Sequence, residues 1–196
     1  MKKICTYVVI FTACWLLVAG TVLQQEKLSS RLIRIHILAN SDSGADQAEK
    51  LLVRDAVLAE VSALTADCAS RQEAAAVLAA HAEELGRTAA GTAGRDVTVA
   101  LSPEWYETRR YDGFSLPAGK YLSLQIKIGE AAGHNWWCVA FPSVCTAATA
   151  EELETTAVSA GFDGGDLRMM TGDDPDVEVR YFLLELISRL RDVIRG

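Results

Sequence analysis

The sequence contains few of the residues from which catalytic and metal sites are usually built. Its 196 residues include only three histidines, His36, His81 and His134, and these are widely separated along the chain. No two potential ligands have zinc-type spacing, and G-x-S-x-G, P-loop and G-x-G-x-x-G patterns are absent. The sequence therefore makes no positive case for an enzyme, and we expect no cofactor and no metal.

Basic residues are also in the minority. The chain has 19 lysines and arginines against 26 aspartates and glutamates, a net charge of −7. The first 20 residues hold two of those lysines and no acid, so the remainder has 17 basic residues against 26 acidic ones, a net charge of −9. Such a surface repels nucleic acid and anionic lipid head groups. We therefore predict no nucleic-acid partner.

Charge is absent altogether from the first long apolar stretch. After the two N-terminal lysines, the 20 residues from Ile4 to Leu23 are uncharged, and this length is enough to span a bilayer as a helix. The stretch Val18-Ala19-Gly20 ends in small residues, as a signal-peptidase site does. Residues 1–23 are therefore predicted to be a signal peptide or an N-terminal membrane anchor. Both interpretations export the chain from about residue 24 onward.

Cysteines of an exported chain can form disulfides, because disulfides persist outside the cytoplasm. Two of the five cysteines lie in the apolar stretch, which leaves Cys68, Cys138 and Cys145. We predict a disulfide between Cys138 and Cys145, because Pro142 between them can reverse the chain. Closing so short a loop stabilises a fold by about 2–3 kcal/mol. A bonded Cys138 has no thiolate, so a catalytic pair with His134 is the less favoured interpretation, and Cys68 is expected to be a free, partly buried thiol.

The order of apolar patterns indicates the fold class. Strand-like alternation or composition occurs at residues 31–38, 96–101, 120–129 and 133–145. Helical periodicity occurs at residues 46–64, 70–85, 148–160 and 179–194. A strand, two helices, three strands and further helices predict an α/β fold. We expect a single domain with a mixed or antiparallel sheet of about four strands packed by helices, preceded by the N-terminal signal or transmembrane helix.

Local signals set finer expectations. The alternation of isoleucine with polar residues in 31–38 indicates a strand with one buried face. Ser70 and Glu73 form an S-x-x-E capping box that opens the second helix, and glycines from Gly86 onward are expected to end it. Residues 161–176 are polar, acidic and glycine-rich, and are predicted to be a loop.

The last helix is strongly amphipathic. Its broad apolar stripe consists of Val179, Phe182, Leu183, Leu186, Ile187, Leu190, Val193 and Ile194. The stripe can pack on the domain, on a partner or on a membrane surface, and packing on the domain is the default expectation. Residues 147–196 are therefore predicted to be a C-terminal helical region packing on the domain.

Two adjacent tryptophans, Trp136 and Trp137, lie in the fourth predicted strand. Neighbouring residues of a strand face opposite sides of a sheet. Tryptophan is common both in cores and in binding hot spots. We expect at least one of the two in the core.

Two long blocks resemble a known family. IRIHILANSDSGADQAEKLLVRDAVL, residues 33–58, and LPAGKYLSLQIKIGEAAGHNWWCVAFPSVC, residues 116–145, are similar to stage II sporulation protein R of endospore-forming bacteria. The resemblance defines a family-like domain at 30–146 and is weak beyond it. The segments GEAAG, Pro142-Ser143 and Glu49-Lys50 depart locally from the family pattern.

The resemblance implies a function that the residues alone do not. Proteins of this family are made in the forespore and exported into the space between the two membranes of the sporangium. There they activate a membrane-embedded aspartic protease of the mother cell, which processes the precursor of sigma factor E. The chain would then be a ligand and not an enzyme. Residues of the two blocks that can lie at the protein surface are candidate contacts with that protease: Asn40, Asp42, Asp46, Arg54, Asn135, Trp136 and Trp137.

Two other hypotheses remain open from the residues. The first is an exported hydrolase, for instance of the cell wall, that uses acids such as Asp42 and Asp46. Capping and the helix dipole explain carboxylates at these positions better. The second is a membrane-tethered scaffold that uses the N-terminal span and the C-terminal amphipathic helix.

Overall fold

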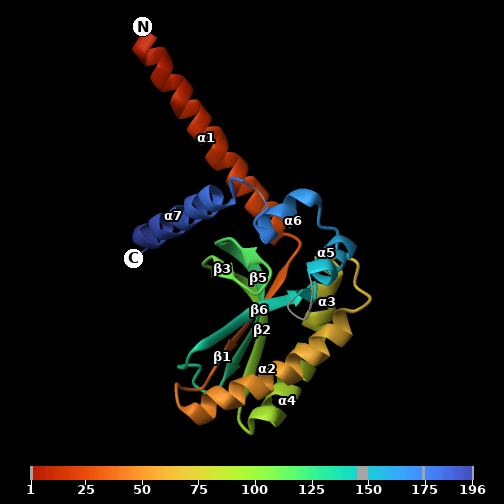
Figure 1. Cartoon of the computed structure of the whole chain (residues 1–196). Helices are drawn as coiled ribbons and strands as arrows, with labels where there is room; N and C mark the ends of the chain where they lie inside the picture. Colours follow the sequence, from red (N-terminus) through yellow and green to blue (C-terminus); the bar gives the residue numbers. More distant parts are fainter. Residues whose placement is uncertain (1, 145–149, 174, 196) are drawn as a thin grey trace. The chain divides into compact units, whose positions relative to one another are not determined.

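The protein is described by a computed structural model that covers residues 2–144, 150–173 and 175–195 (Figure 1). Its elements are α1 (Lys2–Ser29), β1 (Ile33–Leu38), α2 (Gly44–Thr65), α3 (Arg71–Ala80), α4 (Ala82–Ala93), β2 (Val97–Tyr106), β3 (Arg109–Arg110), β4 (Ser115–Leu116), β5 (Gly119–Ile128), β6 (Asn135–Phe141), α5 (Ala150–Ser159), α6 (Gly164–Thr171) and α7 (Val177–Arg195). The predicted α/β class, the four-stranded sheet and the N-terminal apolar helix are confirmed.

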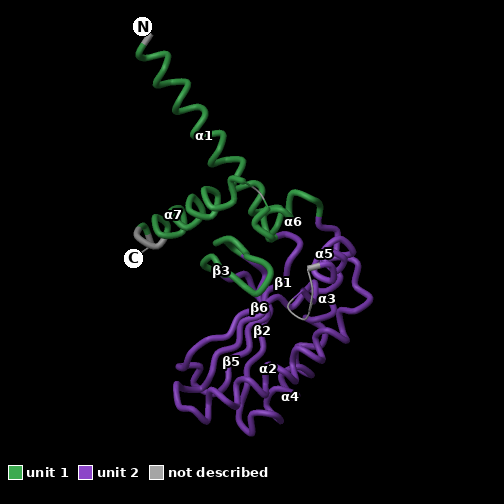
Figure 2. Tube along the Cα trace, in the orientation of Figure 1, with its two compact units in different colours: residues 1–29, 105–120, 163–196 green, residues 30–104, 121–162 purple. Residues whose placement is uncertain are grey.

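The chain forms two compact units, each assembled from separate stretches of sequence (Figure 2). The first unit comprises Met1–Ser29, Trp105–Lys120 and Asp163–Gly196, and the second comprises Ser30–Glu104 and Tyr121–Phe162. The predicted division into residues 30–146 and 147–196 stays a prediction.

The second unit is built on the mixed four-stranded sheet, in the order β2-β5-β1-β6. Strand β1 runs parallel to β5 and antiparallel to β6. A parallel pair needs a long crossover connection, and helices α2 to α4 lie between these strands in the sequence and on one face of the sheet (Figure 1). The register places Ile35 opposite both Leu124 and Cys138, so apolar side chains of three strands share one face.

Strand β1 differs from its predicted half-buried state. Its isoleucines are fully buried, but Arg34 is also 0% exposed and His36 only 8% exposed. The guanidinium of Arg34 lies over the ring of Tyr121, with its carbon 5.0 Å from the ring centroid. Alternation predicts which residues share a face, but a polar side chain with a partner can also be buried. The expectation of one solvated face was wrong because Tyr121 packs against Arg34, and Trp137 and Glu104 pack against His36.

The helices after α2 also differ in part from expectation. Ser70 caps α3 as predicted, accepting from the backbone N–H of Glu73 at 3.2 Å, while the Glu73 carboxylate accepts from Ala69 N–H at 2.8 Å. The predicted end near residue 85 was wrong, because α4 continues through Gly86 to Ala93 and is capped by Gly94, which has a φ of 66°. A glycine inside a helix costs only about 1 kcal/mol relative to alanine, so glycine alone does not end it.

The first unit contains a helix that the sequence did not predict. Helix α6 occupies the stretch expected to be a loop, and a reciprocal capping box between Asp163 and Asp166 opens it. The buried hydroxyl of Tyr181 on α7 lies 2.8 Å from the carbonyl oxygen of Met169 and 3.0 Å from that of Ser115, and the two carbonyls share its single proton. These bonds fasten α7 to α6 and to the β3–β4 hairpin.

Helix α7 presents an unexpected face to the interior. Its buried residues are Val177, Tyr181, Leu184 and Ser188. The exposed large side chains on the opposite face are Val179, Phe182, Leu186, Leu190 and Ile194. The expectation that the stripe packs on the domain was wrong for these five residues. The side chains of α7 that are buried lie on a different side of the helix from the predicted stripe.

Helix α1 also exposes its apolar side chains. The segment Lys3–Ser29 is long and apolar enough to cross a membrane, by length and composition. Phe11, Trp15 and Leu16 are among its exposed residues. A signal sequence and a membrane anchor both have these properties.

Candidate functional site

Two loops of the second unit meet at one end of the sheet. Strands β1 and β6 are antiparallel, which brings the β1–α2 loop beside the β5–β6 loop. Backbone hydrogen bonds join the loops, from Ala132 N–H to the Asn40 carbonyl at 3.1 Å and from Gly133 N–H to the Ala39 carbonyl at 3.0 Å. A Cβ at Gly133 would lie 2.2 Å from the carbonyl oxygen of Ser41, so only glycine fits there.

Asp46, in the first turn of α2, organises the first loop. Its carboxylate accepts from the Asn40 amide at 2.9 Å and from the Ser41 hydroxyl, and pairs with Arg95 at 3.0 Å. These bonds, first of all that of Ser41, lower the pKa of Asp46 below its usual value. The other end of the Asn40 amide accepts from Glu130 N–H at 3.0 Å, which connects the two loops again. Asp46 is only 8% exposed, and its role here is to hold the loop.

Asp42 makes the most exposed connection between the loops. Its carboxylate accepts from the backbone N–H of His134 at 2.6 Å and pairs with the Nδ1 atom of the same residue. Hydrogen bonding to His134 lowers the pKa of Asp42. Beneath them, the buried ammonium of Lys50 donates to the His134 carbonyl at 2.9 Å and to the Gln47 amide at 2.7 Å. We call Asn40, Ser41, Asp42, Asp46 and His134 the loop cluster.

Arg54 and Trp136 form a second feature on the helical side of the sheet. The guanidinium carbon of Arg54, on α2, lies 5.5 Å from the centroid of the Trp136 ring, within the range of a cation–π contact. The Arg54 side chain also donates to Asp55 at 2.8 Å. Both members of the pair are half-buried, so part of each remains accessible.

The other face of the sheet carries a polar group of residues that was not predicted. Trp137 stacks on His36, with ring centroids 5.2 Å apart and an interplanar angle of 22°. The Nδ1 atom of His36 lies 2.8 Å from the Glu104 carboxylate, and Gln125 donates to Ser102 at 3.1 Å. The two tryptophans face opposite sides as predicted, but both are half-buried, so the expected core position was wrong.

The predicted contact residues therefore do not form one surface. Asn40, Asp42 and Asp46 belong to the loop cluster, and the exposed Asn135 follows His134 directly. Arg54 and Trp136 lie on the helical side of the sheet, whereas Trp137 lies on the polar side. No local sequence signal predicts the pairing of Asp42 with His134. It follows only from the register of β1 against β6.

The cysteine predictions have different outcomes. Cys68 is a free, half-buried thiol as expected, and burial raises its pKa. Cys138 is buried. Cys145 lies outside the described residues, so its bond with Cys138 stays a prediction.

The two carboxylates of the loop cluster are hydrogen-bond acceptors. A general acid needs a pKa near the working pH, but hydrogen bonds lower the pKa of both Asp42 and Asp46. Both carboxylates are therefore ionised and act as acceptors. Within residues 2–144, 150–173 and 175–195, no group of three or more His, Cys, Asp or Glu side chains is placed to hold a metal ion.

Sequence comparison assigns the fold and its loops to a family. The family model described as stage II sporulation protein R matches residues 29–151. The chain belongs to the stage II sporulation protein R family. It is 31% identical, over 185 residues, to stage II sporulation protein R of Bacillus subtilis strain 168, an alignment that covers 83% of each chain. No solved structure matches. The segment matched to the stage II sporulation protein R family includes the whole loop cluster and both tryptophans, whereas α6 and α7 follow it.

Proposed function

We propose that this member of the stage II sporulation protein R family is an exported signal between the two compartments of the sporangium. It crosses the forespore membrane into the intermembrane space and activates a membrane-embedded aspartic protease, which then processes the precursor of sigma factor E. The family match supports a role in sporulation. The apolar helix α1 supports export or membrane anchoring.

The observation that carries the proposal is that the loop cluster is held in one fixed arrangement. Backbone bonds, the buried Asp46 and the buried Lys50 hold two loops in one arrangement. A surface that is ordered before binding loses less conformational entropy when a partner docks. The exposed Asp42, His134 and Asn135 are presented on this support.

We assign different roles to the candidate contacts. Asp42 and Asn135 are exposed and would meet the protease directly, with the accessible part of the Arg54–Trp136 pair beside them on the same unit. Asn40 and Asp46 would act by shaping the loop. Trp137 belongs to the polar face of the sheet and is not part of this contact surface.

In this proposal the chain is a non-catalytic activator. The hydrolase alternative requires one of the two acids of the loop cluster to donate a proton, and the lowered pKa of each argues against it.

Reconstitution in a non-sporulating host tests the proposal. The cognate membrane protease and the sigma factor E precursor are expressed with this chain, without it, and with a version that lacks residues 1–23 and stays in the cytoplasm. We expect processing only with the exported chain. Equal processing with and without the chain, or no processing when all three proteins are folded and correctly located, would contradict it.

A further inference from the structure

Helix α7 has two opposed apolar faces, and only one is covered. Val177, Tyr181, Leu184 and Ser188 face the interior of the first unit. On the other side, Val179, Phe182, Leu186, Leu190 and Ile194 recur every three or four residues and form one exposed stripe. Phe182 is 63% exposed and Ile194 83% exposed. A continuous apolar stripe of this length on a soluble surface usually marks a place where something binds.

The stripe begins beside the end of the candidate membrane span. Val179 and Arg180 line a hollow with Leu16, Leu17, Gly20 and Thr21 of α1. The side chain of Arg180 also donates to Gln24, which directly follows the apolar stretch that ends at Leu23. If α1 crosses a bilayer, its charge-free residues occupy the hydrocarbon and Gln24 lies at the interface. The first turn of α7 is then at the level of the membrane surface.

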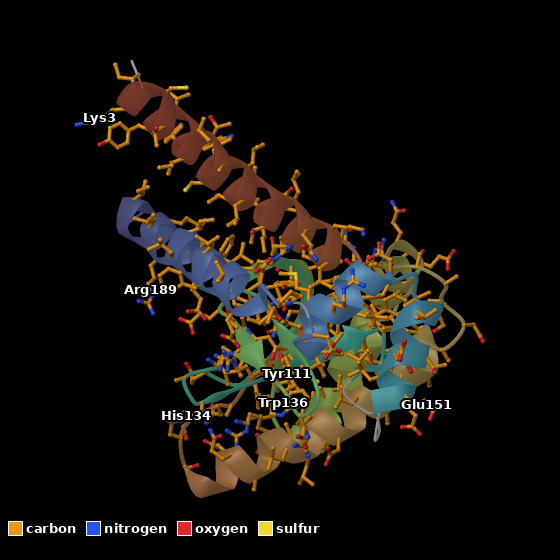
Figure 3. All side chains as sticks on the ribbon, turned by 45° about the horizontal axis from the view of Figure 1, so that its top comes forward. Lys3, Tyr111, His134, Trp136, Glu151 and Arg189 are labelled. Carbon is orange, nitrogen blue, oxygen red and sulfur yellow. The ribbon has the colours of Figure 1, made fainter. Side chains whose placement is uncertain are left out.

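Charged residues flank the stripe on both sides. At 100° per residue, Arg180 and Arg191 lie along one flank of the stripe and Arg189 along the other. Arg189 is exposed and projects outward from α7 (Figure 3). Glu178, at the start of the helix, pairs with Arg110 at 3.1 Å. Arg180 donates to Gln24 and Arg191 lies over the Trp105 ring, whereas Arg189 is exposed, on a flank that also carries Glu185.

We propose that α7 lies in the plane of the membrane surface, as a second bilayer contact beside α1. Its exposed stripe enters the boundary between head groups and acyl chains, and the exposed Arg189 binds a lipid phosphate. Helices that bind membranes in this way carry aromatic and aliphatic residues on one face and basic residues beside it. Arginine can keep its aliphatic stem in the apolar layer while its guanidinium reaches the head groups.

The bilayer is a better fit to the stripe than a protein partner. The residues that adjoin the start of the stripe, Leu16 and Leu17, are themselves exposed and belong to the candidate span. The apolar surface of α7 is therefore continuous with a surface whose composition matches lipid. Arg189, exposed beside the stripe, adds an attraction to anionic head groups. The proposal does not depend on protease activation.

Tryptophan quenching by brominated lipid tests the proposal on the full chain. The protein is reconstituted into vesicles of phosphatidylglycerol and phosphatidylethanolamine, with or without bromine on the acyl chains. Three chains are compared: the parent, Phe182→Trp on the stripe, and Leu52→Trp on α2. Leu52 is a matched control, because it is 61% exposed and also apolar. Circular dichroism and sedimentation establish that each chain is folded and incorporated.

We expect bromine to remove most of the emission added by Phe182→Trp, and little of that added by Leu52→Trp. The emission added by Phe182→Trp should also shift to shorter wavelength in vesicles. Equal quenching of the two variants would overturn the proposal. So would a shift that appears only when the membrane protease is added, because the stripe would then bind protein. If Phe182→Trp does not fold, Leu190→Trp on the same stripe gives the same comparison.

Discussion

The carboxylate of Asp42 accepts a hydrogen bond from the backbone N–H of His134 at 2.6 Å, although 92 positions separate them in the sequence. The bond joins the loop after β1 to the loop before β6. Each loop alone would be a mobile surface segment, and together they form an ordered surface. The arrangement of this surface is therefore a property of the sheet register and of a few side-chain bonds.

The first prediction concerns pH. The pKa of Asp42 is lowered below its ordinary value of 3.8 in the folded state. Its stabilising contribution is therefore present above about pH 3.8 and is lost as the pH falls through the lowered folded pKa. Urea unfolding of the parent and of Asp42→Asn, followed across this range, checks the prediction. The difference in the free energy of unfolding between the two chains should shrink as the pH falls. A difference that stays constant would mean that the ionisation of Asp42 does not contribute to stability.

The second prediction concerns the glycine between the loops. Gly133→Ala places a Cβ against the Ser41 carbonyl, a backbone group that cannot move away without shifting the loop. We expect a loss of about 1–3 kcal/mol in the free energy of unfolding. Gly91→Ala, inside α4 with nothing within 4 Å of the new Cβ, is the control. It should be neutral or stabilising by up to about 1 kcal/mol, and equal effects of the two changes would refute the argument.

The third prediction concerns the first unit. Tyr181→Phe removes the hydroxyl proton that the carbonyls of Met169 and Ser115 share and leaves both carbonyls without it. We expect a loss of about 1–2 kcal/mol in the free energy of unfolding. Tyr7→Phe, on the exposed side of α1, is the control. Thermal unfolding of the three chains in the same detergent gives the comparison, and an unchanged midpoint for Tyr181→Phe would contradict it.

The fourth prediction concerns signalling. In the reconstituted system, Asp42→Ala, Arg54→Ala and Trp136→Ala should each lower processing of the sigma factor E precursor at equal protein level. Truncation of a residue that carries binding energy costs about 1–2 kcal/mol or more, which is roughly a tenfold loss of affinity. Glu83→Ala, which removes an exposed acid on α4, should leave processing unchanged. Normal processing by all three variants would exclude this surface as the contact.

Several elements were predictable from the sequence because their cause is local. Alternation located β1, β2 and β5, and a helical apolar period located α2 and α7. Helix α6 was missed, although its Asp163–Asp166 capping box is visible in the sequence. The two long family-like blocks are recognisable because each is a continuous run of residues, and the family match confirms them.

Burial was less predictable because it depends on what packs above a residue. Arg34 and His36 have the sequence character of solvated strand residues, yet both are buried. Phe182 and Leu186 have the character of core residues, yet both are exposed. The period of a pattern indicates which residues share a face, but not whether that face is covered.

By itself, the sequence determined the apolar N-terminal helix, the α/β class, most of the elements and the family, since each follows from composition, periodicity or continuous blocks of residues. Only the tertiary structure decided which residues from distant blocks meet. The Asp42–His134 bond and the stacking of Trp137 on His36 both depend on the register of β1 against β6. Register is set by the packing of the whole sheet, because a slip by one residue would move every side chain of the strand to the opposite face.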